Sequence, residues 1–157
     1  MPLSQSRKGE AMAKAGIELM GVDAILNKIG NSPQYLHDVV LQKVRENAEK
    51  MAGIQRENCP VDTSLLRESI HTFVEDKGDV ISGGSKTNSS YGAFVEFGTG
   101  QAGDANGHPL DDELGIARKT EWAGQRAQPF MYPGMKAVEG DVQRDFGSAV
   151  EEVLKKK

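Results

Sequence analysis

The residues of this sequence best suited to chemistry gather around one histidine in the second half of the chain. His108 lies close to several carboxylates, and imidazole together with carboxylate is a donor set that metal ions use. These carboxylates are Asp104, Asp111, Asp112 and Glu113. The stretch lacks the Asp-x-Asp-x-Asp-Gly pattern of a calcium loop. We therefore expect a solvated acidic loop over 104–113 rather than a metal site.

Other kinds of catalytic site find little support in the residue pattern. The sequence has no phosphate-binding P-loop, no dinucleotide fingerprint, no Gly-x-Ser-x-Gly turn and no Cys/His spacing of the zinc type. His37 falls beside the apolar stripe of an expected helix, without a second ligand one turn on, and is expected to be partly exposed. His71 alternates with apolar residues, as a solvent-facing strand residue does. We expect no catalytic residue, no metal and no cofactor, and a protein that is not an enzyme.

Glu96 is unusual because apolar residues surround it in the sequence. It stands in the run Phe94-Val95-Glu96-Phe97, where burial of an unpaired charge would be costly. The sequence leaves two hypotheses, exposure to solvent, which we favour, or a salt bridge to an arginine. The candidate partners are Arg67, Arg126 or an arginine from a neighbouring subunit.

Composition indicates one soluble globular domain. The chain has 157 residues, of which 38% are hydrophobic and 27% are charged, as is usual for a folded domain. Its formal net charge is −4, whereas a stable nucleic-acid binder usually carries a basic face. No apolar run approaches the ~20 residues that span a bilayer. The single cysteine, Cys59, is typical of a reducing compartment and is expected to be a small buried residue at a helix end.

Two long amphipathic helices are predicted. The first runs over about 32–57 and begins with Ser32-Pro33 as cap and first-turn proline; the second follows Pro133. Each has an apolar stripe at steps of three and four, formed by Leu36, Val40, Val44, Ala48, Met51 and Ile54 in the first and by Met135, Val138, Val142, Phe146, Ala149 and Val153 in the second. Interior glycines cost up to ~1 kcal/mol each in a helix, so the second helix is expected to pack against the first, against a sheet, or against both.

Shorter elements are predicted around these helices. The spacing of apolar residues over 22–29 favours a short helix, and another is expected after Pro60, capped by Asp62 or Thr63. Turn residues at 76–78 between β-branched flanks predict a hairpin.

The secondary structure of two segments in the second half is harder to predict from the sequence. The run 91–97 fits either a short buried helix or a strand. Residues 100–127 form a polar stretch longer than the ~12–15 residues common in compact domains, and we expect a long mobile loop there with a functional role.

Three segments of the chain carry a family resemblance. They are Cys59–Ile70 (CPVDTSLLRESI), Tyr91–Thr99 (YGAFVEFGT) and Gln128–Met135 (QPFMYPGM). In this order they resemble the minor tail-component family of tailed double-stranded-DNA phages and prophages, also called head–tail joining, tail-completion or neck proteins. Two positions depart from the family pattern: Ser64 replaces a usual glycine and Gly134 a common alanine.

The resemblance implies a fold and a place in the virion. The expected fold is α+β, a small antiparallel sheet packed against the long helix and the C-terminal helix. Residues 22–157 would form a single tail-completion-type domain that contains the 100–127 loop; residues 1–21 are polar and rich in small residues, and are expected to be a flexible leader that extends beyond the family pattern. Such subunits assemble in the host bacterial cytoplasm into a ring at the head–tail junction, which completes the tail and joins it to the head connector.

Partners and residue roles follow from the same resemblance. The expected partners are other copies in a hexameric ring, the tail tube protein, and head connector or stopper proteins; genome DNA would pass through the lumen without specific binding, and no membrane is involved. Alternative functions are a nucleic-acid-associated binding module and, less favoured, a metal-dependent hydrolase using the 104–113 cluster.

Two groups of residues are expected to have structural roles. Those with an expected packing role are Pro60, Val61, Asp62, Thr63, Leu66, Ser69 and Ile70. Those expected at a subunit interface are Phe94, Glu96, Phe97, Gly98, Thr99, Trp122, Arg126, Phe130, Met131 and Tyr132. An alternative places Phe130 and Met131 in the core beneath the last helix. The pairs 98–99 and 129–130 are expected to act as hinges of the loop.

Overall fold

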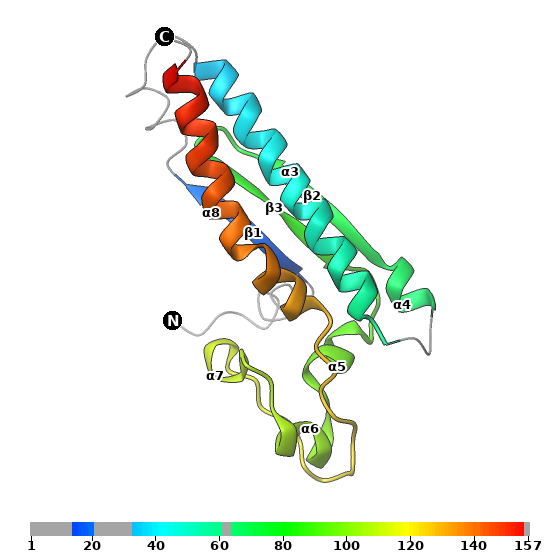
Figure 1. Ribbon diagram of the computed structural model, residues 1–157. Helices are drawn as coiled ribbons and strands as arrows, with labels where there is room; N and C mark the ends of the chain where they lie inside the picture. The colour runs from blue at the N-terminus through cyan, green and yellow to red at the C-terminus, as the bar shows by residue number, and fades with distance from the viewer. Residues whose placement is uncertain (1–13, 21–32, 61–63, 156–157) are drawn as a thin grey trace.

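A computed structural model of the chain describes residues 14–20, 33–60 and 64–155 (Figure 1). The elements are β1 Lys14–Met20, α3 Pro33–Asn58, α4 Ser64–Glu68, β2 Ile70–Asp76, β3 Val80–Thr87, α5 Gly92–Phe97, α6 Gly100–Asn106, α7 Asp111–Leu114 and α8 Met131–Lys155. The helix expected over 22–29 and the motif residues Val61, Asp62 and Thr63 lie outside the described residues.

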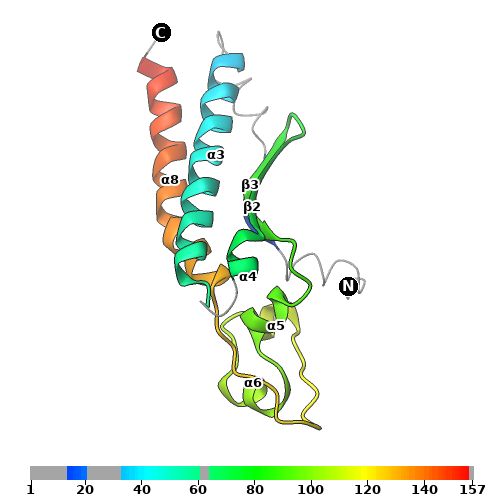
Figure 2. The same ribbon diagram turned by 90° about the vertical axis from the view of Figure 1, so that its right-hand side faces the viewer.

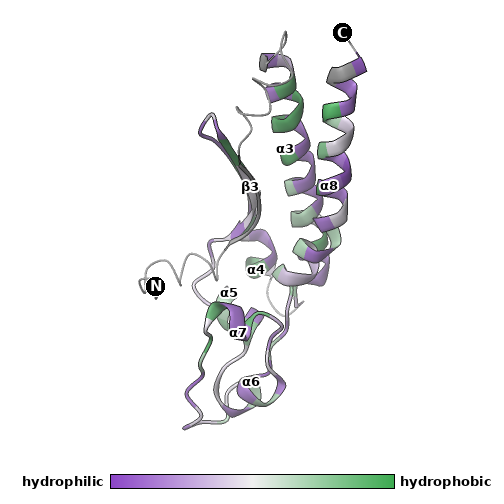
Figure 3. Ribbon diagram, turned by 90° about the vertical axis from the view of Figure 1, so that its left-hand side faces the viewer, coloured by the Kyte–Doolittle hydropathy of each residue, from purple (hydrophilic) through white to green (hydrophobic). Residues whose placement is uncertain are grey.

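Helix α3 confirms the long helix expected over 32–57. Pro33 occupies its first position, where its missing N–H costs no helical hydrogen bond. The predicted stripe is buried except for Ile54, which is half-buried. Apolar and polar positions alternate along the helix with the helical period (Figure 3). The helix ends just before Cys59 and Pro60, because proline disfavours helix in the residue before it.

The sheet has three antiparallel strands in the order β1-β3-β2. The predicted hairpin is confirmed as β2 and β3, with Oδ1 of Asp76 accepting a hydrogen bond from the Gly78 amide in the turn (3.0 Å). The third strand departs from expectation. Residues 1–21 were expected to form a flexible leader, whereas 14–20 form β1 and pair along β3 from Lys14 with Lys86 to Met20 with Val80.

The two long helices cover the sheet. In Figures 2 and 3, α3 lies between the hairpin and α8, and both helices contact the sheet. The core is divided into two clusters. One, towards the hairpin turn, contains Leu36, Val40, Val44, Ile81 and Ala149. The other, at the opposite end, joins α3, α4, β2 and the start of α8. The chain therefore has the α+β fold that was expected, an antiparallel sheet with a long helix and a C-terminal helix packed against it.

A lobe of residues 92–130 extends beyond the ends of α3 and α8 (Figures 1 and 2). Its first element, α5, decides the open question over 91–97 in favour of a helix. Residues 100–127 were expected to form one long loop, but they contain the short helices α6 and α7. The segments that enter and leave this stretch also pair, because Thr99 and Gln125 form an antiparallel bridge with N···O distances of 2.8 and 3.0 Å.

Candidate subunit-contact site

Glu96 lies at the junction of the lobe with α8. Its side chain is only 3% exposed, so the favoured expectation of a solvent-facing carboxylate is wrong. Oε2 accepts hydrogen bonds from the amides of Phe130 (2.7 Å) and Met131 (2.8 Å), and Oε1 accepts one from the amide of Tyr132 (3.0 Å). The carboxylate thus satisfies first-turn amides of α8, whose donors have no partner inside the helix. Its negative charge also faces the positive end of the helix dipole.

His108 is the side-chain partner of Glu96. Its Nε2 lies 2.9 Å from Oε1 of Glu96, and the imidazole is fully buried. Nδ1 accepts a hydrogen bond from the Leu110 amide (3.1 Å), so the hydrogen of a neutral ring is on Nε2 and is donated to Glu96. The ring also contacts Phe97 and Tyr132, with centroids 4.5 and 5.4 Å away. Glu96 is therefore paired with a histidine of its own chain, not with Arg67 or Arg126, the partners named by the alternative hypothesis.

Of the acidic residues around His108, Asp111 is also held by hydrogen bonds, whereas Asp104, Asp112 and Glu113 are exposed. Arg118 donates to both carboxylate oxygens of Asp111, at 2.9 and 2.6 Å, and to the carbonyl of Phe97. Burial on its own would raise the pKa of the Asp111 carboxyl, but hydrogen bonds from Arg118 and from the His108 amide outweigh it and hold the pKa below its usual value. The expectation of a solvated loop over 104–113 is wrong for His108, which points to Glu96, and for Asp111, which points to Arg118.

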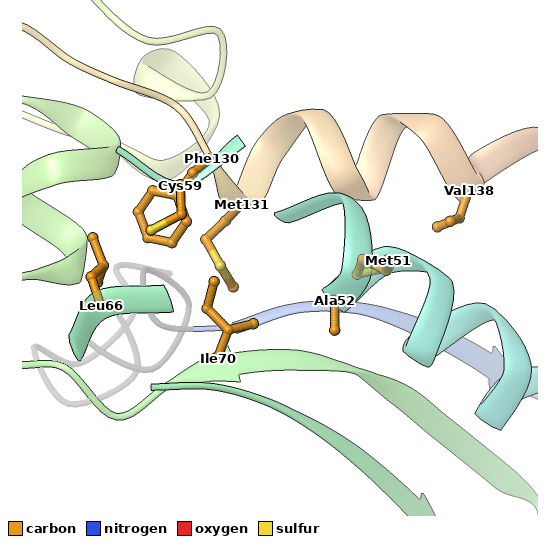
Figure 4. Packing of buried hydrophobic residues seen from close by; sticks show 8 residues of the cluster. All are labelled: Met51, Ala52, Cys59, Leu66, Ile70, Phe130, Met131 and Val138. Carbon is orange, nitrogen blue, oxygen red and sulfur yellow. The ribbon is translucent and has the colours of Figure 1, made fainter. Parts of the chain in front are cut away.

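Four of the first-motif residues with an expected packing role lie within the described residues: Pro60, Leu66, Ser69 and Ile70. Leu66 and Ile70 are buried in the cluster at the lobe end of the core, together with Cys59 (Figure 4). Ser69 donates from Oγ to the carbonyl of Leu66 (2.6 Å) and lies 2.6 Å from Oγ1 of Thr87. Pro60 is half-buried.

The predicted interface residues separate into two groups. Glu96, Phe97, Gly98, Phe130 and Met131 are buried inside the chain. Figure 4 shows Phe130 and Met131 beside Cys59, Leu66 and Ile70, where the core alternative placed them. Gly98 has a φ of +72°, and a Cβ on it would lie 2.5 Å from the Ala127 amide nitrogen, so this position accepts only glycine.

The remaining predicted residues are accessible. Phe94 and Trp122 are 56% and 57% exposed, Arg126 is exposed, and Thr99 and Tyr132 are half-buried. Phe94, Phe97, Ile116 and Trp122 line a hollow of about 250 Å³ with Lys119 beside them, which we call the lobe groove. A pair of exposed aromatic rings at one groove is a feature of protein-contact surfaces.

A larger hollow of about 550 Å³ runs along the first half of α8. Tyr132, Met135 and Val138 line it from the helix, and Leu110 lines it from the lobe. The two hollows show that the described surface is concave on the lobe and beside α8.

The other two histidines, His37 and His71, lie away from the junction of the lobe with α8. His71 is exposed on β2, as expected. His37, half-buried on α3, lies with Nε2 2.7 Å from Oδ2 of Asp76 at the end of β2. This contact holds the pKa of the Asp76 carboxyl below its usual value.

Sequence reasoning missed the Glu96–His108 pair, although one signal for it was present. The residues before α8 are Gln128, Pro129 and Phe130, and none of them is a usual N-terminal cap. The first turn of α8 also has no acidic residue. A long helix without a local cap requires hydrogen-bond acceptors from elsewhere in the chain.

Part of the chain matches one known protein family. Residues 23–98 match the family described as "Bacteriophage HK97-gp10, putative tail-component". The matched residues include α3, α4, the hairpin and α5, whereas the rest of the lobe and α8 lie beyond the match. Comparison with curated proteins and with solved structures gave no match. No helix within the described residues is long and apolar enough to cross a membrane.

A component of a phage tail is a structural part of the virion and contacts other structural proteins of the phage. Over residues 23–98, just under half of its length, this chain is similar to the HK97-gp10-like family of bacteriophage tail components.

Proposed function

We propose that this protein is a structural subunit of the phage neck, which forms a ring at the head–tail junction, completes the tail and joins it to the head connector. The observation that carries the proposal is the lobe groove. It places Phe94 and Trp122, both more than half exposed, on a part of the chain that extends away from the two long helices. Exposed aromatic side chains are enriched at the energetic centres of protein interfaces.

The charge of the chain agrees with a ring through which genome passes. A protein that lets DNA slide has to avoid tight contacts with phosphate, and a net charge of −4 favours repulsion over binding. The neighbours of the ring would be the tail tube protein on one side and connector or stopper proteins on the other. DNA would cross the lumen without specific binding.

The metal-dependent hydrolase alternative is not supported by the geometry of 104–113. Its imidazole is committed to Glu96 and its Asp111 carboxylate to Arg118, and the residues described in the structure include no group of three or more His, Cys, Asp or Glu side chains that could hold a metal ion. The nucleic-acid-associated module is tested separately by retention on heparin at moderate salt, which the ring function predicts to be poor.

Light scattering across a concentration series, with negative-stain images, tests the proposal. We expect closed rings, or monomers that convert to rings when purified tail tubes are added. Monomers at every concentration that do not respond to tail tubes would contradict the ring function.

Matched variants test the contact residues separately. Trp122→Ala and Phe94→Ala are expected to weaken ring formation at least ~10-fold, since a hot-spot side chain contributes about 2 kcal/mol or more. Leu65→Ala is the control, because Leu65 is 68% exposed but does not line the lobe groove. If all three variants form rings as the wild type does, the ring function stands and the assignment of the groove as a contact fails.

A further inference from the structure

The polar junction between the lobe and the rest of the chain continues as a buried path of hydrogen bonds. His108 donates to Glu96, and Glu96 accepts from the Met131 amide. The carbonyl of the same Met131 accepts from Nε2 of Gln55 on α3 (2.9 Å), and Oε1 of Gln55 accepts from the hydroxyl of Ser85 on β3. All five residues are buried. The path therefore runs from the centre of the lobe through α8 and α3 to the central strand of the sheet.

Apolar contacts alone do not explain how the lobe is oriented. Phe130 and the half-buried Val95 pack into the core at this end, but apolar packing is largely non-directional. Hydrogen bonds have preferred angles as well as distances. Glu96 accepts four of them, from three consecutive backbone amides and one imidazole, so the angle between the lobe and α8 is specified at its carboxylate.

Glu96 is also well placed to act on the groove. It lies on α5, one turn or less from Phe94 and Phe97, which line the groove. Its partner His108 lies against the ring of Phe97. A change at the carboxylate would therefore move the segments that carry the groove, without altering the exposed side chains.

We propose that Glu96 is the positioning residue of the contact surface: through the buried path it fixes the lobe, and with it the Phe94–Trp122 groove, in one orientation relative to α3, α8 and the sheet. The inference rests on the proposed function, because it assigns the groove as the surface that is oriented. It predicts that loss of the carboxylate frees the lobe while α3, α8 and the hairpin stay folded.

The variant of choice is Glu96→Gln, which keeps the shape of the side chain. Its amide group keeps one acceptor oxygen but presents NH₂ to groups that are themselves donors, the imidazole Nε2–H and one backbone N–H. Glu96→Ala removes the side chain altogether. Glu113→Gln is the matched control, because it makes the same chemical change at an exposed carboxylate of the lobe.

Two measurements on the full chain report the orientation of the lobe. Spin labels on Asp104→Cys in α6 and Ser148→Cys in α8, both exposed positions, give a distance distribution across the junction. The native Cys59 is buried and stays unlabelled in the folded protein. We expect one narrow distribution in the wild type and in Glu113→Gln, and a broadened one with an added population in Glu96→Gln. Hydrogen exchange at the amides of 130–132 is expected to accelerate at least ~10-fold, as befits loss of a charged hydrogen-bond acceptor.

A third measurement connects the lobe to assembly. Ring formation by Glu96→Gln is expected to fall, although Phe94 and Trp122 are unchanged, while Glu113→Gln assembles as the wild type does. Circular dichroism establishes that each variant is folded, and if Glu96→Ala unfolds, Glu96→Gln decides the question. An unchanged distance distribution together with unchanged exchange in Glu96→Gln overturns the proposal. If the wild type forms no rings, the ring function fails, and the distance and exchange data still decide whether Glu96 positions the lobe.

Discussion

Oε1 of Glu96 lies 2.9 Å from Nε2 of His108, and both side chains are withdrawn from solvent. The two residues belong to different elements, α5 and the segment between α6 and α7. Their contact takes the histidine out of the acidic cluster in which the sequence places it. Of the side chains that look like a metal-binding group in the sequence, His108 is paired with Glu96 and Asp111 with Arg118, while Asp104, Asp112 and Glu113 are exposed.

Replacement of the imidazole tests the contribution of this pair to stability. His108→Phe keeps a ring between Phe97 and Tyr132 but removes the donor to Glu96 and the acceptor for the Leu110 amide. The free energy of unfolding is expected to fall by about 1–3 kcal/mol, because buried polar groups lose their partners. Urea unfolding measures it. His71→Phe makes the same change at an exposed strand position and should stay within ~0.5 kcal/mol; equal losses in both variants would contradict the interpretation.

Gly134 lies where α8 packs closely against α3. A Cβ on it would lie 2.9 Å from the Met51 carbonyl oxygen and closer still to Cγ of Gln55. Gly134→Ala is therefore expected to destabilise the protein by about 1–3 kcal/mol through overpacking. Gly140→Ala in the same helix meets nothing within 4 Å and should stabilise it by ~0.5–1 kcal/mol, since alanine is the better helix former. Thermal unfolding measures the change in stability of both variants. We expect changes of opposite sign, and stabilisation by both would contradict the close packing of α8 against α3 at Gly134.

The pair of Asp111 with Arg118 predicts a pH dependence. The carboxyl has a lowered pKa in the folded chain, so its contribution to stability is present above the unfolded-state pKa of about 3.9. It is lost as the pH falls through the lower, folded-state pKa. Asp111→Asn should thus be less stable than the wild type at pH 7, and the difference should shrink as the pH falls below about 4. Asp112→Asn, at the exposed neighbouring carboxylate, serves as the control. A wild-type advantage over Asp111→Asn that is constant from pH 7 to pH 2 would exclude this linkage.

Trp122 is the single tryptophan of the chain and reports directly on the lobe groove. Because its side chain is more than half exposed, the isolated protein should emit at the long wavelength of a hydrated indole and be readily quenched by acrylamide. Assembly into a ring should shift the emission to shorter wavelength and reduce quenching. Emission of a buried indole in the monomer would place Trp122 inside the chain instead.

Cys59 is a probe of the core at the lobe end. Burial raises the pKa of its thiol, an effect that Arg67 offsets only in part. Reaction with a disulfide reagent at pH 8 is therefore expected to be slow in the native protein and complete in urea, since the thiolate is the reactive form. Ser148→Cys, whose added thiol is exposed, should react at once. Similar rates for both thiols under native conditions would be incompatible with the packing of Phe130 and Leu66 around Cys59.

Much of the helix–sheet body could be predicted because its signals are local. The stripe from Leu36 to Met51 repeats with the period of a helix, and the turn residues at 76–78 separate two β-branched segments, so short windows of sequence are sufficient. The run 91–97 could not be assigned in this way, because Phe94, Val95 and Phe97 fit both periods. The environment of α5, with Gly92 against Thr87 and Leu66 and with Glu96 against α8, makes it a helix.

By itself, the sequence determined the two long helices, the hairpin, the α+β class and the motifs of a phage tail component. Periodicity and turn chemistry act between residues a few positions apart, which the order of amino acids already contains. Only the tertiary structure decided that 14–20 form a third strand, that the 100–127 stretch folds back on itself through Thr99 and Gln125, and that Glu96 is buried against His108. Those features depend on contacts across tens of residues, and a buried charge becomes stable only when folding brings its hydrogen-bond donors together.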